Sequence, residues 1–151
     1  MLKRFKDFVN EAKNFLKDEI FSAYNGRYLF NVSKAYKLIN SGGVKSRIEE
    51  YPNYYLRRYS DENLSMVDPN KISKIRSEMR YEDPIGLLVK FKNPEDLESN
   101  GEWILIDGNH RVRIAGDDGM NGKLTVINDP DDVKKFMSFN PNIPHELFPD
   151  Y

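Results

Sequence analysis

The sequence predicts an α+β fold, close to the α/β type, in a single compact domain with a small mixed sheet and an N-terminal helical extension. Two observations support this fold class. Strand-like and helix-like segments alternate along the second half of the chain, and an amphipathic helix pattern occupies its beginning. With 151 residues, 39% of them hydrophobic, the chain is long enough to bury a core.

The clearest helix pattern covers residues 2–20, where apolar side chains recur at spacings of three and four. A turn at Asn25-Gly26 ends this region, and residues 28–32 follow as a candidate strand. Ser33 is a candidate cap for a helix over residues 34–40, which the pair Gly42-Gly43 should stop. The apolar positions of the first helix are Leu2, Phe5, Val9, Ala12, Leu16 and Ile20.

Charge divides the chain unevenly. Residues 1–60 contain 12 Lys and Arg against 6 Asp and Glu, whereas residues 61–151 contain 11 against 18. Within residues 44–64, arginines interleave with tyrosines, a mixture that suits either a base-stacking, phosphate-contacting surface or the rim of a core. The basic half could likewise face a nucleic acid or attract the acidic half of the same fold. We therefore divide the chain into a basic helical extension, 1–60, packed on a core domain, 61–151.

Within residues 61–151 the expected elements begin with a helix from Pro69 to about Arg80, capped by Asp68 and buried through Ile72, Ile75 and Met79. The strands expected are 85–91, 103–106 and 124–128, the first two neighbouring and joined by a polar loop over 93–101. A last helix over 133–139 should follow the cap Asp129-Pro130, and the tail should dock through Ile143, Leu147 and Phe148.

The most informative stretch is residues 103–115. An apolar, partly β-branched run, 103–106, precedes Asp107-Gly108-Asn109-His110-Arg111, and a new apolar spacing indicates a short helix from about Asn109. A strand that turns through glycine into a helix N-terminus exposes backbone N–H groups suited to an anion. Arginine adds bidentate contacts to phosphate. The stretch therefore predicts a phosphate-binding loop, and its alternative role is a tight turn.

This pentad, together with residues 65–72 and Asp83-Pro84-Ile85, resembles the signature of the ParB/sulfiredoxin superfamily. The resemblance covers roughly residues 65–127 and implies a nucleotide such as ATP, ADP or CTP, with Mg²⁺, at the loop. The chain departs from sulfiredoxins because Asn109 occupies the cysteine position and the sequence contains no cysteine. About two dozen residues follow the last core strand, too few for the helix-turn-helix module of chromosome-partitioning ParB proteins. Of the functions known in this superfamily, the resemblance then implies a ParB-like nuclease or a nucleotide-dependent phosphotransferase.

The candidate site residues follow from the loop and the resemblance. Gly108, Asn109 and Arg113 are predicted to bind phosphate, and Arg111 to neutralise it. His110 is the candidate acid/base or donor. Asp107 could orient His110 or Arg111, hold a metal, or form an Asx turn. By resemblance, the helix bearing Lys71 and Lys74 borders the nucleotide site, although a solvated face is the alternative. The candidate metal carboxylates are Glu82 and Asp83, with Glu78 nearby.

A second resemblance concerns residues 5–12, Phe5-Lys6-Asp7-Phe8-Val9-Asn10-Glu11-Ala12, which are similar to capsid-targeting peptides cleaved after their glutamate in large tailed phages. It implies a packaged protein that is injected into a host, and its alternative is an ordinary docked helix. No apolar run is long enough for a membrane span, and Met1–Lys17 lacks a signal-peptide core. We expect a protein of the cytoplasm, the host's if phage-encoded, or of the virion head. The rival to an enzyme is a non-catalytic protein that binds a host protein or DNA and keeps the loop only as fold architecture.

Overall fold

The structure is a computed structural model that describes residues 18–60, 63–96, 98, 100–140 and 142. It combines helices with a three-stranded and a four-stranded sheet, so the predicted α+β class is confirmed. The chain forms two compact units, one of residues 1–43 with 134–151 and one of residues 44–133. This division differs from the expected boundary at residue 60, and we describe each unit by itself.

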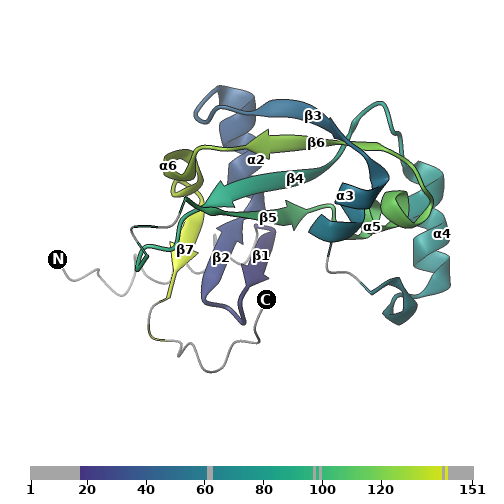
Figure 1. Cartoon of the computed structure of the whole chain (residues 1–151), viewed down its shortest axis with the longest axis horizontal. Helices are drawn as coiled ribbons and strands as arrows, with labels where there is room; N and C mark the ends of the chain where they lie inside the picture. The colour runs from purple at the N-terminus through teal and green to yellow at the C-terminus, as the bar shows by residue number, and fades with distance from the viewer. Residues whose placement is uncertain (1–17, 61–62, 97, 99, 141, 143–151) are drawn as a thin grey trace. The chain divides into compact units, whose positions relative to one another are not determined.

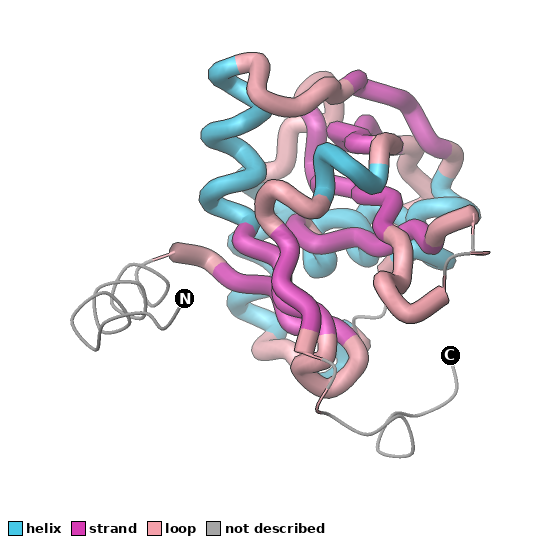
Figure 2. The backbone as a smooth tube through the Cα atoms, turned by 90° about the vertical axis from the view of Figure 1, so that its left-hand side faces the viewer, coloured by secondary structure: helices cyan, strands magenta, loops and turns pink. Residues whose placement is uncertain are grey.

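The first unit contains a three-stranded antiparallel sheet in the order β1 (Ile20–Ala23), β2 (Tyr28–Asn31), β7 (Met137–Phe139) (Figures 1 and 2). Helix α2 (Val32–Ser41) follows β2 directly and ends at Gly42, which adopts the left-handed conformation as predicted. Phe30, Val32 and Ala35 are among the buried apolar residues of this unit. The candidate strand at residues 28–32 is confirmed over 28–31, whereas Val32 begins α2.

Three expectations in this unit are wrong. Ile20 lies in strand β1, because its backbone pairs with Asn31, and so the first helix does not extend to residue 20. The side chain of Asn31, not Ser33, caps α2 by accepting from the Lys34 amide. The Ser33 hydroxyl instead accepts from the Glu19 amide. The helix predicted over 133–139 is absent among the described residues, since residues 137–139 form strand β7 and pair with β2; the short helix α6 (Pro130–Val133), in the second unit, ends at Val133.

The predicted helix over residues 2–17, the targeting-like motif at 5–12 and the docking residues Ile143, Leu147 and Phe148 lie outside the described part of the chain. Their structure and processing remain predictions. Among the described residues, none of the helices combines the length and the apolar character needed to span a membrane.

The second unit contains the mixed four-stranded sheet, ordered β3 (Arg47–Tyr51), β6 (Gly122–Ile127), β4 (Pro84–Phe91), β5 (Glu102–Asp107) (Figure 1). Strands β4 and β5 are antiparallel neighbours, as predicted, whereas β4 and β6 run parallel. Trp103 departs from the expected buried strand, because β5 is an edge strand in the described sheet and leaves this ring 38% exposed.

Four helical segments complete the described second unit beside α6: α3 (Asn53–Tyr59), the short 3-10 helix η1 (Leu64–Met66), α4 (Pro69–Glu78) and α5 (Asn109–Asp117). Helix α4 begins as predicted, since the Asp68 carboxylate accepts from the Asn70 amide. Its apolar face is less buried than expected: α4 has no fully buried residue, because Ile72 and Ile75 are only partly covered.

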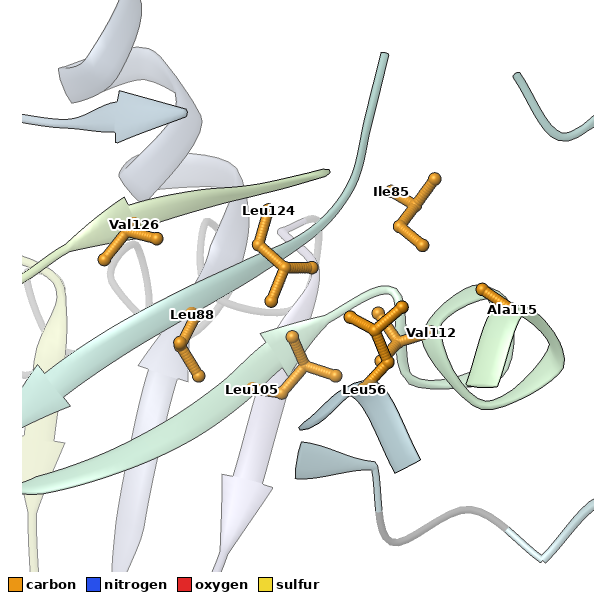
Figure 3. Close-up of a cluster of buried hydrophobic side chains, with 8 residues drawn as sticks. All are labelled: Leu56, Ile85, Leu88, Leu105, Val112, Ala115, Leu124 and Val126. Atoms are coloured by element: carbon orange, nitrogen blue, oxygen red, sulfur yellow. The ribbon is translucent and has the colours of Figure 1, made fainter. Parts of the chain in front are cut away.

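The core of the second unit explains why residues 44–60 belong to it. Leu56 of α3 is completely buried in a cluster with side chains of the sheet and of α5 (Figure 3). Strand β3 also hydrogen-bonds to β6 over its whole length. A boundary at residue 60 would therefore cut both the sheet and the core. The other cluster members are Ile85, Leu88, Leu105, Val112, Ala115, Leu124 and Val126.

Candidate functional site

The centre of the candidate site is the turn at Gly108, which joins the end of β5 to the start of α5. Gly108 has a φ of +83°, in the left-handed region. A Cβ atom added there would lie 2.1 Å from the Ile85 carbonyl oxygen and 2.8 Å from the Gly86 Cα. The glycine is therefore required by the turn and by the close approach of the chain to its own strand β4.

The first turn of α5 presents the backbone amides predicted for an anion site. The first intrahelical bond runs from the Val112 amide to the Gly108 carbonyl, at 2.8 Å, and the N-cap residue Gly108 has no side chain with which to cap the helix. The amides of Asn109, His110 and Arg111 precede that bond, so they have no acceptor within the helix. They also lie at the positive end of the helix dipole, which favours a negative group.

Asp107 and Arg111 flank this turn. The Arg111 guanidinium lies 3.4 Å from the Asp107 carboxylate, and the two side chains are 42% and 16% exposed. Charge-assisted N–H···O contacts are typically nearer 2.8 Å, so this ion pair is a weak one. His110 is partly buried at the second helical position. The structure thus brings Asp107, Gly108, His110 and Arg111 together at one helix end.

Asn109 connects the turn to the rest of the unit. Its side-chain amide donates to the Leu105 carbonyl at 3.2 Å, and its own carbonyl accepts from the buried Ser60 hydroxyl at 2.9 Å. Sequence reasoning missed Ser60, which lies 49 residues away in the chain and follows α3, a segment with no motif of its own. Asn109 therefore braces the turn against β5 and α3.

Helices α3 and α5 pack antiparallel. Ser60, at the end of α3, contacts the start of α5, whereas Asn53 and Arg57 approach Gly116 in its last turn. A Cβ atom on Gly116 would lie 2.4 Å from the Arg57 Cγ, so the absence of a side chain allows the close approach. The guanidinium of Arg57 reaches the Asp117 carboxylate at 3.3 Å.

Arg113, predicted to bind phosphate, forms an ion pair with Asp117 at 3.2 Å. Asp117 is the last residue of α5, so this guanidinium is directed toward the end of the helix opposite Gly108. The structure does not bring it to the turn with Arg111.

Lys71 and Lys74 are exposed on α4, which packs beside α5. The ion pair that joins the two helices lies near their C-terminal ends, where Arg76 contacts the Asp118 carboxylate through two nitrogens, at 2.8 and 3.1 Å. This hydrogen-bonded carboxylate also raises the pKa of Arg76. The contact fixes the end of α4 away from Gly108, and no described contact brings either lysine to the turn.

Glu82 and Asp83 precede β4, whose start lies beside the end of β5 because the two strands are antiparallel. They therefore share the end of the sheet that carries Gly108. Both side chains are exposed, and the Glu82 backbone carbonyl accepts from the Lys123 ammonium at 3.3 Å. Among the described residues, no three His, Asp or Glu side chains gather closely enough to hold a metal ion.

Comparisons of the chain with protein-family models, with curated proteins and with solved structures found no match. The proposals below are therefore argued from the chain's own residues.

Proposed function

We propose that the second unit binds a phosphate group of a nucleotide or nucleic acid at the Gly108 loop, defined as residues 107–111. The supporting observation is the start of α5 directly after a left-handed glycine, which has no side chain of its own to occupy the first backbone amides. Three successive amides and the helix dipole then favour an anion at this point.

Arg111 supplies the side-chain part of the proposed site. Its contact with Asp107 is long, and a phosphate oxygen could replace that carboxylate with a shorter, bidentate contact. Asp107 would then give up its contact with Arg111. The proposal therefore keeps the backbone amides of Asn109, His110 and Arg111, the turn at Gly108 and the Arg111 side chain. It assigns Arg113 to its pair with Asp117.

As an enzyme, the chain would perform phosphoryl transfer or phosphodiester cleavage on ATP, ADP, CTP or a nucleic acid. Arg111 would stabilise negative charge on the phosphate, and His110 would donate or accept a proton beside it. Mg²⁺ often binds through one or two carboxylates together with substrate phosphates. The Asp107 carboxylate fits that role, and Glu82 and Asp83 lie at the same end of the sheet.

A second candidate function is non-catalytic binding of a host protein or DNA, with the loop kept as fold architecture. One observation favours it: Gly108 and Asn109 are both explained by contacts within the unit, to β4, β5 and Ser60. In that case, replacing Arg111 or His110 by another residue would not impair function.

Titration of ATP, ADP and CTP, each with and without Mg²⁺, into the full chain and its Arg111→Ala variant tests the proposal. Loss of the guanidinium should weaken binding roughly tenfold to a hundredfold, since hydrogen bonds to charged groups contribute about 1.5–3 kcal/mol. Arg111→Lys should restore part of the affinity, because an ammonium lacks the planar fork.

Arg113→Ala is the matched control, since it removes the same side chain two residues further along α5 and should leave binding unchanged. His110→Ala then separates the two functions. In an enzyme, turnover should fall by about a hundredfold while binding persists. If Arg111→Ala binds nucleotides as tightly as the unchanged chain, the loop is not the phosphate site.

A further inference from the structure

Helix α3 carries a row of tyrosines, which we define as Tyr54, Tyr55 and Tyr59. The ring centroids of Tyr54 and Tyr55 are 4.6 Å apart, and those of Tyr55 and Tyr59 are 6.5 Å apart with planes only 21° from parallel. Tyr51, the last residue of β3, packs edge-on against Tyr59, with the two ring centroids 5.7 Å apart. These contacts place the four rings next to one another.

One end of the tyrosine row packs on the hydrophobic core, and the other end is exposed to solvent. Tyr51 and Tyr59 pack against the hydrophobic core, whereas Tyr54 and Tyr55 are 58% and 38% exposed. Burial raises the pKa of Tyr59, and the nearby Tyr55 and Glu49 raise it further. The row therefore presents two aromatic rings to solvent beside two that pack on the core, which is an arrangement suited to stacking unpaired bases.

The charge of α3 suits a polyanion. Its last turn contains Arg57 and Arg58, and the helix has no acidic residue. Arg58 is exposed, while Arg57 shares Asp117 with Arg113. On the neighbouring strand β3, the carboxylate of Glu49 is engaged by Arg47 at 3.0 Å and by the Tyr51 hydroxyl at 3.2 Å. The surface beside the rings is thus not dominated by unneutralised acid.

The row also leads toward the Gly108 loop. Ser60, the residue after Tyr59, donates to the Asn109 carbonyl at 2.9 Å, so the last ring of the row is attached next to the first turn of α5. Stacking rings and a helix N-terminus consequently meet in one unit. A mononucleotide has one base, whereas the row offers several rings in succession, and in a duplex the base faces are already stacked.

We propose that the tyrosine row and the Gly108 loop form one continuous surface for a single-stranded nucleic acid, with bases stacked on Tyr54 and Tyr55 and a backbone phosphate at the start of α5. This inference rests on the proposed function, because it names the substrate class of the same loop. Recognition by stacking tolerates any base, so little sequence preference is expected.

The test measures fluorescence anisotropy of labelled oligothymidylate and oligouridylate, each of about fifteen nucleotides, a length near the upper range of such sites. The full chain is compared with the pairs Tyr54→Leu/Tyr55→Leu and Tyr54→Phe/Tyr55→Phe. Loss of both rings should weaken binding by roughly tenfold to a hundredfold, because each stacked base contributes substantially to affinity. The phenylalanine pair keeps the rings and should bind like the unchanged chain.

Trp103→Ala is the matched control, since this ring is as exposed as Tyr55 but lies on β5, the opposite edge of the sheet from β3. It should leave the affinity unchanged. A duplex of the same length should compete poorly, and preference between the two oligonucleotides distinguishes DNA from RNA.

Three results would overturn the inference in separable ways. If the leucine pair binds single strands normally while Arg111→Ala does not, the loop binds phosphate and the tyrosines do not stack bases. If ATP binds but neither oligonucleotide does, the substrate is a free nucleotide and the proposed function stands. If single strands depend on the tyrosines but not on Arg111, the loop assignment fails and with it the continuous surface.

Discussion

Replacing Gly108 with alanine should destabilise the second unit far more than the same change at Gly119. Both glycines adopt the left-handed conformation, with φ of +83° and +73°, and they lie at the two ends of α5. A Cβ atom at Gly119 has no heavy atom within 4 Å. At Gly108 the Cβ atom would meet the Ile85 carbonyl oxygen at 2.1 Å. The pair therefore separates backbone strain from steric overlap.

The magnitudes follow from these distances. A non-glycine residue in the left-handed region costs about 1–2 kcal/mol, and that cost applies to both variants. Overpacking adds typically 1–3 kcal/mol where flexible side chains can move. The atoms that Gly108→Ala would meet belong to the backbone of β4 at Ile85 and Gly86, and Gly86 is paired with Leu124 of β6. We therefore expect about 1–2 kcal/mol for Gly119→Ala and at least about 3 kcal/mol for Gly108→Ala.

Urea unfolding followed by the fluorescence of Trp103 is a suitable assay, because this is the only tryptophan in the sequence and it lies in the four-stranded sheet, on the edge strand β5. The midpoint should shift without a change in slope if the folded state alone is affected. Equal destabilisation by the two substitutions would refute the reasoning, since it would mean that β4 yields to the added methyl group.

Two further predictions concern the core and the pH dependence of stability. Leu56→Ala should destabilise the second unit by about 2–5 kcal/mol, because its side chain is fully buried between α5 and the sheet, whereas Ile48→Ala, at an exposed position, should change little in the same assay. Burial and the Glu49 carboxylate raise the pKa of Tyr51 from 10.0 to about 12. The neutral phenol is thus favoured in the folded state, so its stabilising contribution is complete below pH 10 and is lost as the pH rises through about 12. Urea midpoints across this range should fall less steeply in Tyr51→Phe, and an unchanged slope against pH would contradict the assignment.

Much of the second unit could be predicted because its signals are local. Asp68-Pro69 is a cap followed by proline, and it starts α4 where expected. The apolar runs at 85–91 and 103–106 became the neighbouring strands β4 and β5. Gly108 marked the transition from strand to helix, since only a residue without a Cβ atom fits that turn. Each of these features depends on residues within a few positions of one another.

The remainder depends on contacts between distant residues. Residues 137–139 follow a helix-starting cap, yet they form β7 because Tyr28 and Phe30 of β2 offer an edge to pair with. Asn31 and Ser33 are both good caps, and the pairing of β1 with β2 decides between them by engaging the Ser33 hydroxyl with Glu19. Likewise the sequence suits Arg113 to phosphate as well as it suits Arg111, and only the ion pair of Arg113 with Asp117, one helical turn away, distinguishes the two.

The residues of the Gly108 loop differ in how well their replacement can test the proposed function. Gly108 and Asn109 are required for folding by the approach to Ile85, by Leu105 and by Ser60, so loss of activity on their replacement would not distinguish a ligand site from a structural turn. Arg111 differs, because its side chain is 42% exposed and its contact with Asp107 is weak. Its replacement should therefore cost little stability, and any loss of binding can be assigned to the missing guanidinium. For that reason Arg111, rather than the glycine that identifies the motif, is the residue on which the proposed function should be tested.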